Sequence, residues 1–286
     1  MLPSLRSTAV ALVVLAWLPA SRASANTICD LTSAGSSCSI TGGTGSTGLF
    51  FTDEQHPTGT GVIDSFLRLQ QNGYEQGYNT SDRSYPGGSK MQPIIQDKTD
   101  PNFTIDLPLA AVGTKTINGV LYAEFFLDIN EQATNNGNRN LLTLDQLEIF
   151  TSGQASLNNY SNGGANNATG SLSGATKVFD LDTATSDNWV QLDYTLAGQG
   201  SGSSDMVFYL PYSYLNGANY VYLFSEFGNI DGNNKKYASG AGFEEWFTKS
   251  SLGVTTHSTV PEPATLTLFG TGLLGLARLR RRPSVG

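Results

Sequence analysis

The stretch Lys115–Asn130, KTINGVLYAEFFLDIN, has the clearest strand pattern in the chain. It is rich in β-branched and aromatic residues, among them Val120, Phe125 and Ile129, and such residues favour strands. A second stretch, Leu144–Ser152, alternates apolar with polar residues, which is typical of a strand with one buried face. Both stretches predict β-structure in the middle of the chain.

Shorter runs of the same kind continue outward from these two, bounded by Gly, Asn, Asp or Pro: Leu49–Thr52, Gly61–Gln70, Asn102–Leu107, Lys177–Asp180, Trp189–Leu196, Asp205–Leu210, Asn219–Phe227 and Gly242–Phe247. No segment has a long helical period, so we expect little helix beyond a turn at Pro211–Leu215, where Pro fits a helix start. The pattern predicts an all-β body: an antiparallel β-sandwich of about ten strands, jelly-roll or immunoglobulin-like.

The stretch Gly153–Gly174 consists almost entirely of Asn, Ser, Gly and Ala. It is either a flexible linker that divides the body or a long exposed loop within one sandwich. Neither half has enough strands to close two sheets by itself. We therefore expect one domain over residues 26–254.

The N-terminus has the pattern of a removable signal peptide. Arg6 is followed by the apolar run Thr8–Ala20 and by the small residues Ala23-Ser24-Ala25. The alternative is a permanent anchor, but a spanning helix needs about 20 apolar residues and this run is shorter. We expect export by the Sec machinery and cleavage by signal peptidase after Ala25, so that residues 1–25, a signal helix, are removed.

The C-terminus has three parts in order: the motif Val260-Pro261-Glu262-Pro263, the apolar run Ala264–Ala277, and a basic stop of Arg278, Arg280, Arg281 and Arg282. As a helix, the 16 residues Ala264–Leu279 span about 24 Å of a hydrocarbon core of about 30 Å, and snorkelling arginines reduce the difference. Basic residues stay in the cytoplasm, which places the body across the membrane. We expect a short transmembrane helix that anchors the chain transiently in the inner membrane.

This tail, together with an N-terminal signal, resembles a PEP-CTERM sorting signal, which is also labelled an ice-binding protein C-terminal segment. The resemblance implies processing by exosortase, a membrane protease of Gram-negative bacteria that make extracellular polysaccharide. Residues 260–286 would be the sorting signal and residues 255–259 a spacer. Body stretches such as Gly59–Arg68 and Gly242–Trp246 resemble uncharacterised PEP-CTERM proteins, which implies no activity.

The charge of the chain excludes some partners. The net charge is −8, and the two terminal segments hold six of the 16 Lys and Arg but only one of the 24 Asp and Glu. The body between them therefore carries ten cations, 23 anions and a net charge of −13. Such a surface repels nucleic acid and suits divalent cations or neutral glycans.

The two cysteines, Cys29 and Cys38, follow the cleavage site closely. In an exported protein a close pair indicates a disulfide, here one that closes a small N-terminal loop. Only two histidines exist, His56 before Pro57 and His257 in the spacer, so the chain has few partners for a metal or a catalytic base.

Two Asp and Asn turns are candidates for Ca²⁺, which prefers oxygen ligands: Asp180, Asp182 and Asp187 in one, and Asp231 with Asn233 in the other. Neither matches the complete EF-hand loop, and such residues also form ordinary turns. We expect no obligatory cofactor and keep Ca²⁺ as an open alternative.

Three tyrosines near predicted turns, Tyr212, Tyr214 and Tyr220, are candidates for stacking on sugar rings, although most aromatics of a sandwich fill its core. A glycosidase would need two carboxyls about 5–10 Å apart. Glu244 and Glu245 are adjacent, so a strand directs them to opposite faces. Glu124, Asp128, Glu148 and Glu226 lie on or near predicted strands as possible partners.

We expect a non-catalytic structural or adhesive protein of the cell surface or of the extracellular polysaccharide matrix, as found in biofilms. A carbohydrate-binding module with an exposed aromatic platform is the alternative. A glycan-processing enzyme with two carboxyls in one cleft is a third hypothesis.

Overall fold

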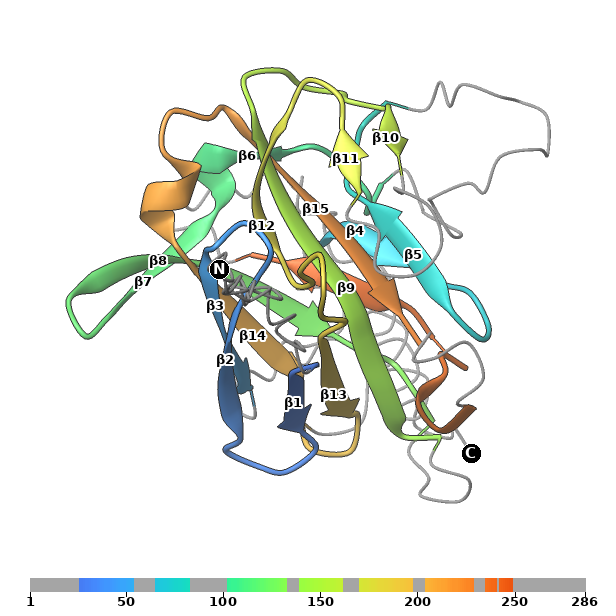
Figure 1. Ribbon diagram of the computed structural model, residues 1–286. Helices are drawn as coiled ribbons and strands as arrows, with labels where there is room; N and C mark the ends of the chain where they lie inside the picture. The colour runs from blue at the N-terminus through green and yellow to red at the C-terminus, as the bar shows by residue number, and fades with distance from the viewer. Residues whose placement is uncertain are drawn as a thin grey trace, which may run out of the picture.

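The computed structural model describes residues 26–53, 65–82, 102–132, 139–161, 170–197, 204–228, 235–240 and 242–248. Within these ranges the chain forms β-strands and short 3₁₀ turns, which confirms the all-β class (Figure 1). The predicted signal helix, the spacer and the predicted membrane helix lie outside the described residues. In the part that is described, no helix has the length and apolar character needed to cross a membrane.

The first sheet has seven strands around the long strand β9 (Leu141–Ser152). Its order is β1 (Ile28–Leu31), β13 (Trp189–Asp193), β9, β15 (Tyr220–Phe227) and β5 (Glu75–Tyr78), with β12 (Thr176–Asp180) paired to β9 and β6 (Leu107–Pro108) paired to β15. The antiparallel prediction is wrong at one edge, where β1 runs parallel to β13. After β1 the chain crosses to the second sheet, and it reaches β13 only after many further strands. Such a long connection permits parallel pairing of β1 with β13.

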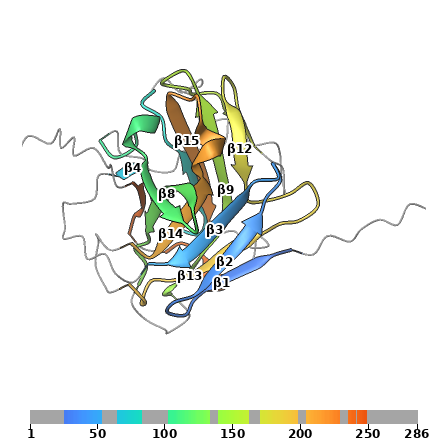
Figure 2. The ribbon, with the colours of Figure 1, turned by 90° about the vertical axis from the view of Figure 1, so that its left-hand side faces the viewer.

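The second sheet also has seven strands. Its order is β2 (Ser37–Thr41), β3 (Thr47–Thr52), β14 (Met206–Pro211), β8 (Val120–Asp128), β16 (Glu244–Phe247) and β4 (Ser65–Leu69), with β7 (Gly113–Ile117) paired to β8. Figure 2 shows β1, β2 and β3 from the side. The strands outnumber the ten predicted, because pieces as short as β6 lack a recognisable pattern and because one predicted strand divides.

The stretch Lys115–Asn130 divides into the hairpin of β7 and β8. Asn118 and Gly119 form its two-residue turn with φ angles of 49° and 81°. Asn-Gly is the favoured pair for such a turn, because both positions need positive φ. The hairpin projects from the body at the left of Figure 1. Asn102–Leu107 was predicted as a strand, but turns occupy most of it and only Leu107 joins β6.

Side chains from both sheets share one core. Leu144 and Ile149 of β9 and Phe208 of β14 are among its fully buried members. The indole N–H of Trp246 on β16 donates to the Ser225 hydroxyl on β15 at 3.1 Å, which links the sheets inside this core. Smaller apolar clusters lie outside it, around Phe150, Tyr222 and Phe224 and around Phe126, Val207 and Tyr209.

The described parts of Gly153–Gly174 pack on the first sheet. They form the two-stranded sheet of β10 (Tyr160–Ser161) and β11 (Ser171–Leu172). The Tyr160 ring stacks on Phe224 with centroids 4.4 Å apart. The 3₁₀ turn η3 (Tyr212–Leu215) follows Pro211 as predicted, and η1 (Leu109–Ala111) and η5 (Lys235–Tyr237) are two further turns of this kind.

Candidate functional site

Several predicted residues fall outside the described ranges. They are the cleavage residues Ala23 and Ala25, the motif Val260-Pro261-Glu262-Pro263, the arginines Arg278, Arg280, Arg281 and Arg282, and the calcium candidates Asp231 and Asn233. The structure therefore places only the disulfide, the first Asp turn and the three tyrosines.

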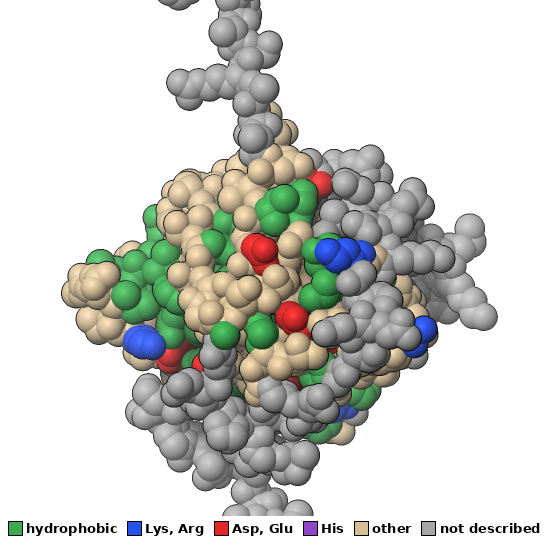
Figure 3. Space-filling model, turned by 90° about the horizontal axis from the view of Figure 1, so that it is seen from below, with side chains coloured by type: hydrophobic (Ala, Val, Ile, Leu, Met, Phe, Trp, Pro, Cys, Tyr) green, Lys and Arg blue, Asp and Glu red, His purple; other side chains and the backbone are tan. Residues whose placement is uncertain are grey.

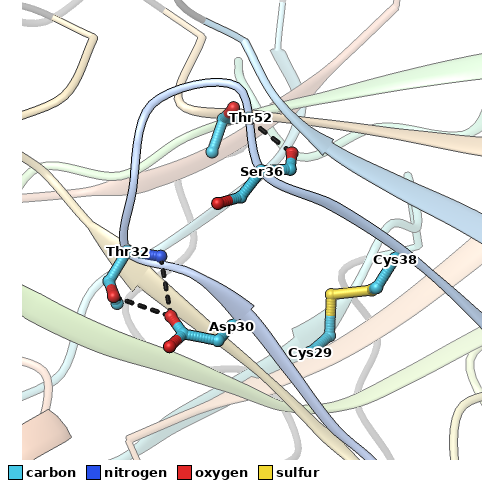
Figure 4. The surroundings of a disulfide bond; sticks show 6 residues. All are labelled: Cys29, Asp30, Thr32, Ser36, Cys38 and Thr52. Carbon is cyan, nitrogen blue, oxygen red and sulfur yellow. Dashed lines mark hydrogen bonds between the residues drawn. A yellow bond between two sulfur atoms is a disulfide. The ribbon is translucent and has the colours of Figure 1, made fainter.

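Cys29 and Cys38 form a disulfide with Cα atoms 5.8 Å apart, as the sequence predicts (Figure 4). Cys29 lies on β1 of the first sheet and Cys38 on β2 of the second, so the bond joins the two sheets. The loop between these strands begins with a local turn, in which the Thr32 hydroxyl and N–H donate to Asp30 Oδ1 at 2.6 Å and 2.9 Å. These hydrogen bonds, the hydroxyl foremost, lower the pKa of Asp30.

The Asp turn after β12 brings Asp180 and Asp182 close together, and both are buried. Protein donors already reach them: Lys177 Nζ donates to Asp180 Oδ2 at 2.8 Å, and the Asn188 N–H donates to Asp182 Oδ1 at 2.7 Å. Burial, chiefly, raises the pKa of Asp182 to about 8. Within the described ranges no group of three His, Cys, Asp or Glu has metal-binding geometry. Calcium at Asp180, Asp182 and Asp187 stays a prediction.

The three tyrosines lie in different surroundings. Tyr212 is half-buried and packs against the main core, whereas Tyr220 is half-buried and packs on the outer cluster of the first sheet. Tyr214 is 43% exposed on η3. Of the three, Tyr214 is therefore the ring available for stacking on a sugar.

A charged network lies on the outer side of the first sheet, around Glu148 of β9. Glu148 is fully buried and accepts from Lys177 Nζ at 2.6 Å, from the Gly170 N–H at 2.6 Å and from the Tyr160 hydroxyl at 2.7 Å. Burial raises the pKa of Glu148, while Lys177 opposes that rise. The network attaches the segment of β10 and β11 to the sheet, and its members are far apart in the sequence.

Three carboxyls that the sequence analysis did not combine converge between the sheets. They belong to Glu75 at the start of β5, Glu131 after β8, and Glu244 at the start of β16. Glu75 and Glu244 are 0% exposed and Glu131 is 5% exposed. The Gly240 N–H donates to Glu131 Oε1 at 3.1 Å, and the Glu244 carboxyl interacts with the Glu75 carboxyl. We call these three residues the interior carboxyl cluster.

Burial decides the protonation of this cluster. It raises the pKa of Glu131 to about 8, and the nearby charge of Glu75 adds to the rise. It also raises the pKa of Glu244 well above the usual range, again with Glu75 as the next cause. A protonated carboxyl avoids the cost of a buried charge. Glu131, with a pKa of about 8, is therefore mostly protonated at neutral pH.

The adjacent Glu245 points to the other face of β16, as strand alternation predicts. Its Oε1 accepts from the Ser65 hydroxyl at 3.2 Å and lies 3.8 Å from Arg68 Nη1. The Arg68 guanidinium itself lies between the rings of Phe103 and Phe243, 3.9 Å and 4.2 Å from their centroids. Alternation in Glu244-Glu245-Trp246-Phe247 could have indicated one inward Glu, but not which distant carboxyls it meets.

Comparison with known proteins concerns the C-terminal tail. Residues 259–282 match the family model of the PEP-CTERM protein-sorting motif. The chain carries a PEP-CTERM sorting motif. The match includes the Pro-Glu-Pro element, the apolar run and all four arginines, and it confirms the resemblance found in the sequence. The motif marks an exported protein that is anchored in the membrane and then processed by exosortase. Neither a curated protein nor a solved structure matches the chain.

Proposed function

We propose that this PEP-CTERM protein is a non-catalytic structural or adhesive component of the cell surface or of the extracellular polysaccharide matrix. The observation that carries the proposal is the sorting motif at residues 259–282. The motif directs the chain to exosortase, after signal peptidase has removed residues 1–25. We further infer that the two seven-stranded sheets, which share one core, pack face to face as a β-sandwich.

The surroundings of the carboxyls support a role without catalysis. A glycosidase places two carboxyls about 5–10 Å apart on either side of a sugar ring. In the interior carboxyl cluster, Glu75 and Glu244 have no exposed surface, so a sugar ring has no access to them. Glu148 is equally buried and is bound by Lys177 and Tyr160. These carboxyls therefore have a structural role in the interior of the body.

The disulfide supports delivery outside the cell. Disulfides persist in oxidising compartments such as the periplasm and the extracellular space. Cys29 and Cys38 tie the edges of both sheets near the expected start of the mature chain. A body held in this way suits a load-bearing or adhesive role in a matrix.

The test is expression of the full chain in a polysaccharide-producing Gram-negative host, with and without its exosortase gene. In the presence of exosortase we expect the protein in the extracellular matrix fraction, with a C-terminus that lacks Arg278–Arg282 by mass spectrometry. In the absence of the enzyme, or in a Pro261→Ala, Glu262→Ala variant, it should stay in the membrane fraction. A full-length chain that is untrimmed and soluble in the cytosol would contradict the proposal.

A carbohydrate-binding role is the second candidate, favoured by the exposure of Tyr214. Tyr214 is 43% exposed beside the turn at Asn216-Gly217. Each ring that stacks on a sugar contributes on the order of 1 kcal/mol. We expect Tyr214→Ala to weaken cosedimentation with the host polysaccharide about fivefold, which is that energy expressed as an affinity, and Tyr220→Ala to weaken it less. Equal cosedimentation of Tyr214→Ala and the wild type would remove the candidate.

A further inference from the structure

One end of the second sheet exposes large apolar side chains. Val120 and Leu121, beside the hairpin turn, are each 46% exposed. Tyr122 pairs with Pro211, and η3 follows directly with its exposed Tyr214. We call η1, the β7–β8 hairpin and η3 the neutral end of the body. Exposed apolar side chains that gather in this way mark a contact surface.

Charge is distributed unevenly along the strands. Residues 107–123 contain one charged side chain, Lys115, and residues 206–225 contain none. The carboxyls at the opposite ends of β8, β14 and β16, those of Asp128, Asp205 and Glu244, are buried. Figure 3 shows the projecting hairpin at its left, mostly green and tan. The two neutral stretches contain no carboxylate that an anionic lipid surface would repel.

The last described strand, β16, runs toward the neutral end. β16 and β7 are both antiparallel to β8 and pair with it on the same side, so both run toward the hairpin turn. Thr248, which follows β16, accepts from the Gly113 N–H at 2.8 Å and donates to the Glu124 carbonyl at 3.0 Å. Thr248 is the last described residue before the sorting motif. Thr248 thus lies beside the base of the hairpin.

The distances permit contact between this end and a bilayer. From the Gly113 and Glu124 pair to the Asn118-Gly119 turn, five strand residues extend about 17 Å. The motif match begins at residue 259, so ten residues follow Thr248 before it. Ten extended residues reach at most about 35 Å. The start of the sorting motif can therefore lie level with the hairpin turn.

We propose that the neutral end is a membrane-contact surface, and that the hairpin tip with Val120 and Leu121 enters the lipid headgroup region while the sorting tail anchors the chain. Val120 and Leu121 supply apolar area. Tyr122 and Tyr214 have amphipathic rings that favour the membrane–water interface, and Lys115 is attracted to anionic headgroups. This proposal rests on the membrane-anchored precursor and not on the matrix role. The failure of one proposal therefore leaves the other standing.

The test uses the full chain, reconstituted through its tail into vesicles of phosphatidylethanolamine and phosphatidylglycerol. Because the chain has two cysteines and both are in the disulfide, a Leu121→Cys variant offers one free thiol for a polarity-sensitive fluorophore. Val120→Cys gives a second reporter. Asn72→Cys is the matched control, at an exposed position just beyond Leu69 and therefore at the end of the second sheet away from the hairpin turn.

We expect the labels at 121 and 120 to shift to the blue and to be quenched several-fold more by brominated acyl chains than the label at 72. Three outcomes would overturn the proposal: labels at 121 and 120 that report water, equal quenching at all positions, or a blue shift that disappears when the protein is diluted within the vesicles. The last outcome would assign the surface to a second copy of the chain. Circular dichroism establishes that each variant is folded.

Discussion

Cys29 and Cys38 are joined across the edges of two different sheets, with Cα atoms 5.8 Å apart. Cys29 is 1% exposed and belongs to the main core. The bond therefore fixes the only parallel strand among the described residues, β1, against β2 of the opposite sheet.

Removal of this disulfide should lower the free energy of unfolding by about 2–3 kcal/mol, because the unfolded chain regains the entropy of a closed loop of about ten residues. The variant is Cys29→Ala, Cys38→Ala, and the measurement is urea denaturation. A thiol reductant should shift the wild type to a similar extent and leave the variant unchanged. Identical midpoints for the oxidised wild type and the variant would be the contrary result.

Lys177→Met should destabilise the body by about 3–5 kcal/mol, because it leaves the Glu148 carboxyl buried without its cation. The double variant Lys177→Met, Glu148→Gln should recover a large part of that loss, since it removes both charges. Urea denaturation of the two single variants and the double variant gives the coupling energy. Strictly additive losses would mean that the 2.6 Å contact does not stabilise the fold.

The free energy of unfolding should decrease as pH rises from about 4.5 to about 8. Glu131 has a pKa of about 8 in the fold and about 4.5 when unfolded, so the folded state binds more protons in this window. Its contribution is about 1.4 kcal/mol per pH unit. Glu131→Gln, which stays neutral, should make the slope shallower by that amount in urea titrations at several pH values. An unchanged slope would show that Glu131 is charged in the fold.

Gly42→Ala should destabilise the body by more than about 1 kcal/mol, because a Cβ there collides with the carbonyl oxygen of Asp180. The neighbouring Gly43 N–H donates to the same oxygen at 3.0 Å, so the backbone cannot withdraw without breaking that bond. Gly153→Ala is the control, since its Cβ meets only Asn219 Nδ2 at 4.0 Å. Equal thermal midpoints for both variants would contradict this packing.

Local patterns predicted most of the long strands. β9, β14 and β15 each lie within three residues of a predicted range, and β8 lies inside one, because alternation of apolar residues and turn residues acts over short distances. β5 was missed, since Glu75-Gln76-Gly77-Tyr78 has no apolar alternation although all four residues are buried. β1 and β2 were missed because they are short and their partners lie in distant parts of the chain.

The sequence by itself determined the all-β class and the sorting motif, because each is encoded by neighbouring residues. Only the tertiary structure decided that Lys115–Asn130 divides into a hairpin, that Cys29 and Cys38 bridge two sheets, that Glu75, Glu131 and Glu244 meet, and that β16 runs toward the hairpin turn. Contacts between residues far apart in the chain depend on which strands pair and in which direction, and the pattern of a single strand specifies neither.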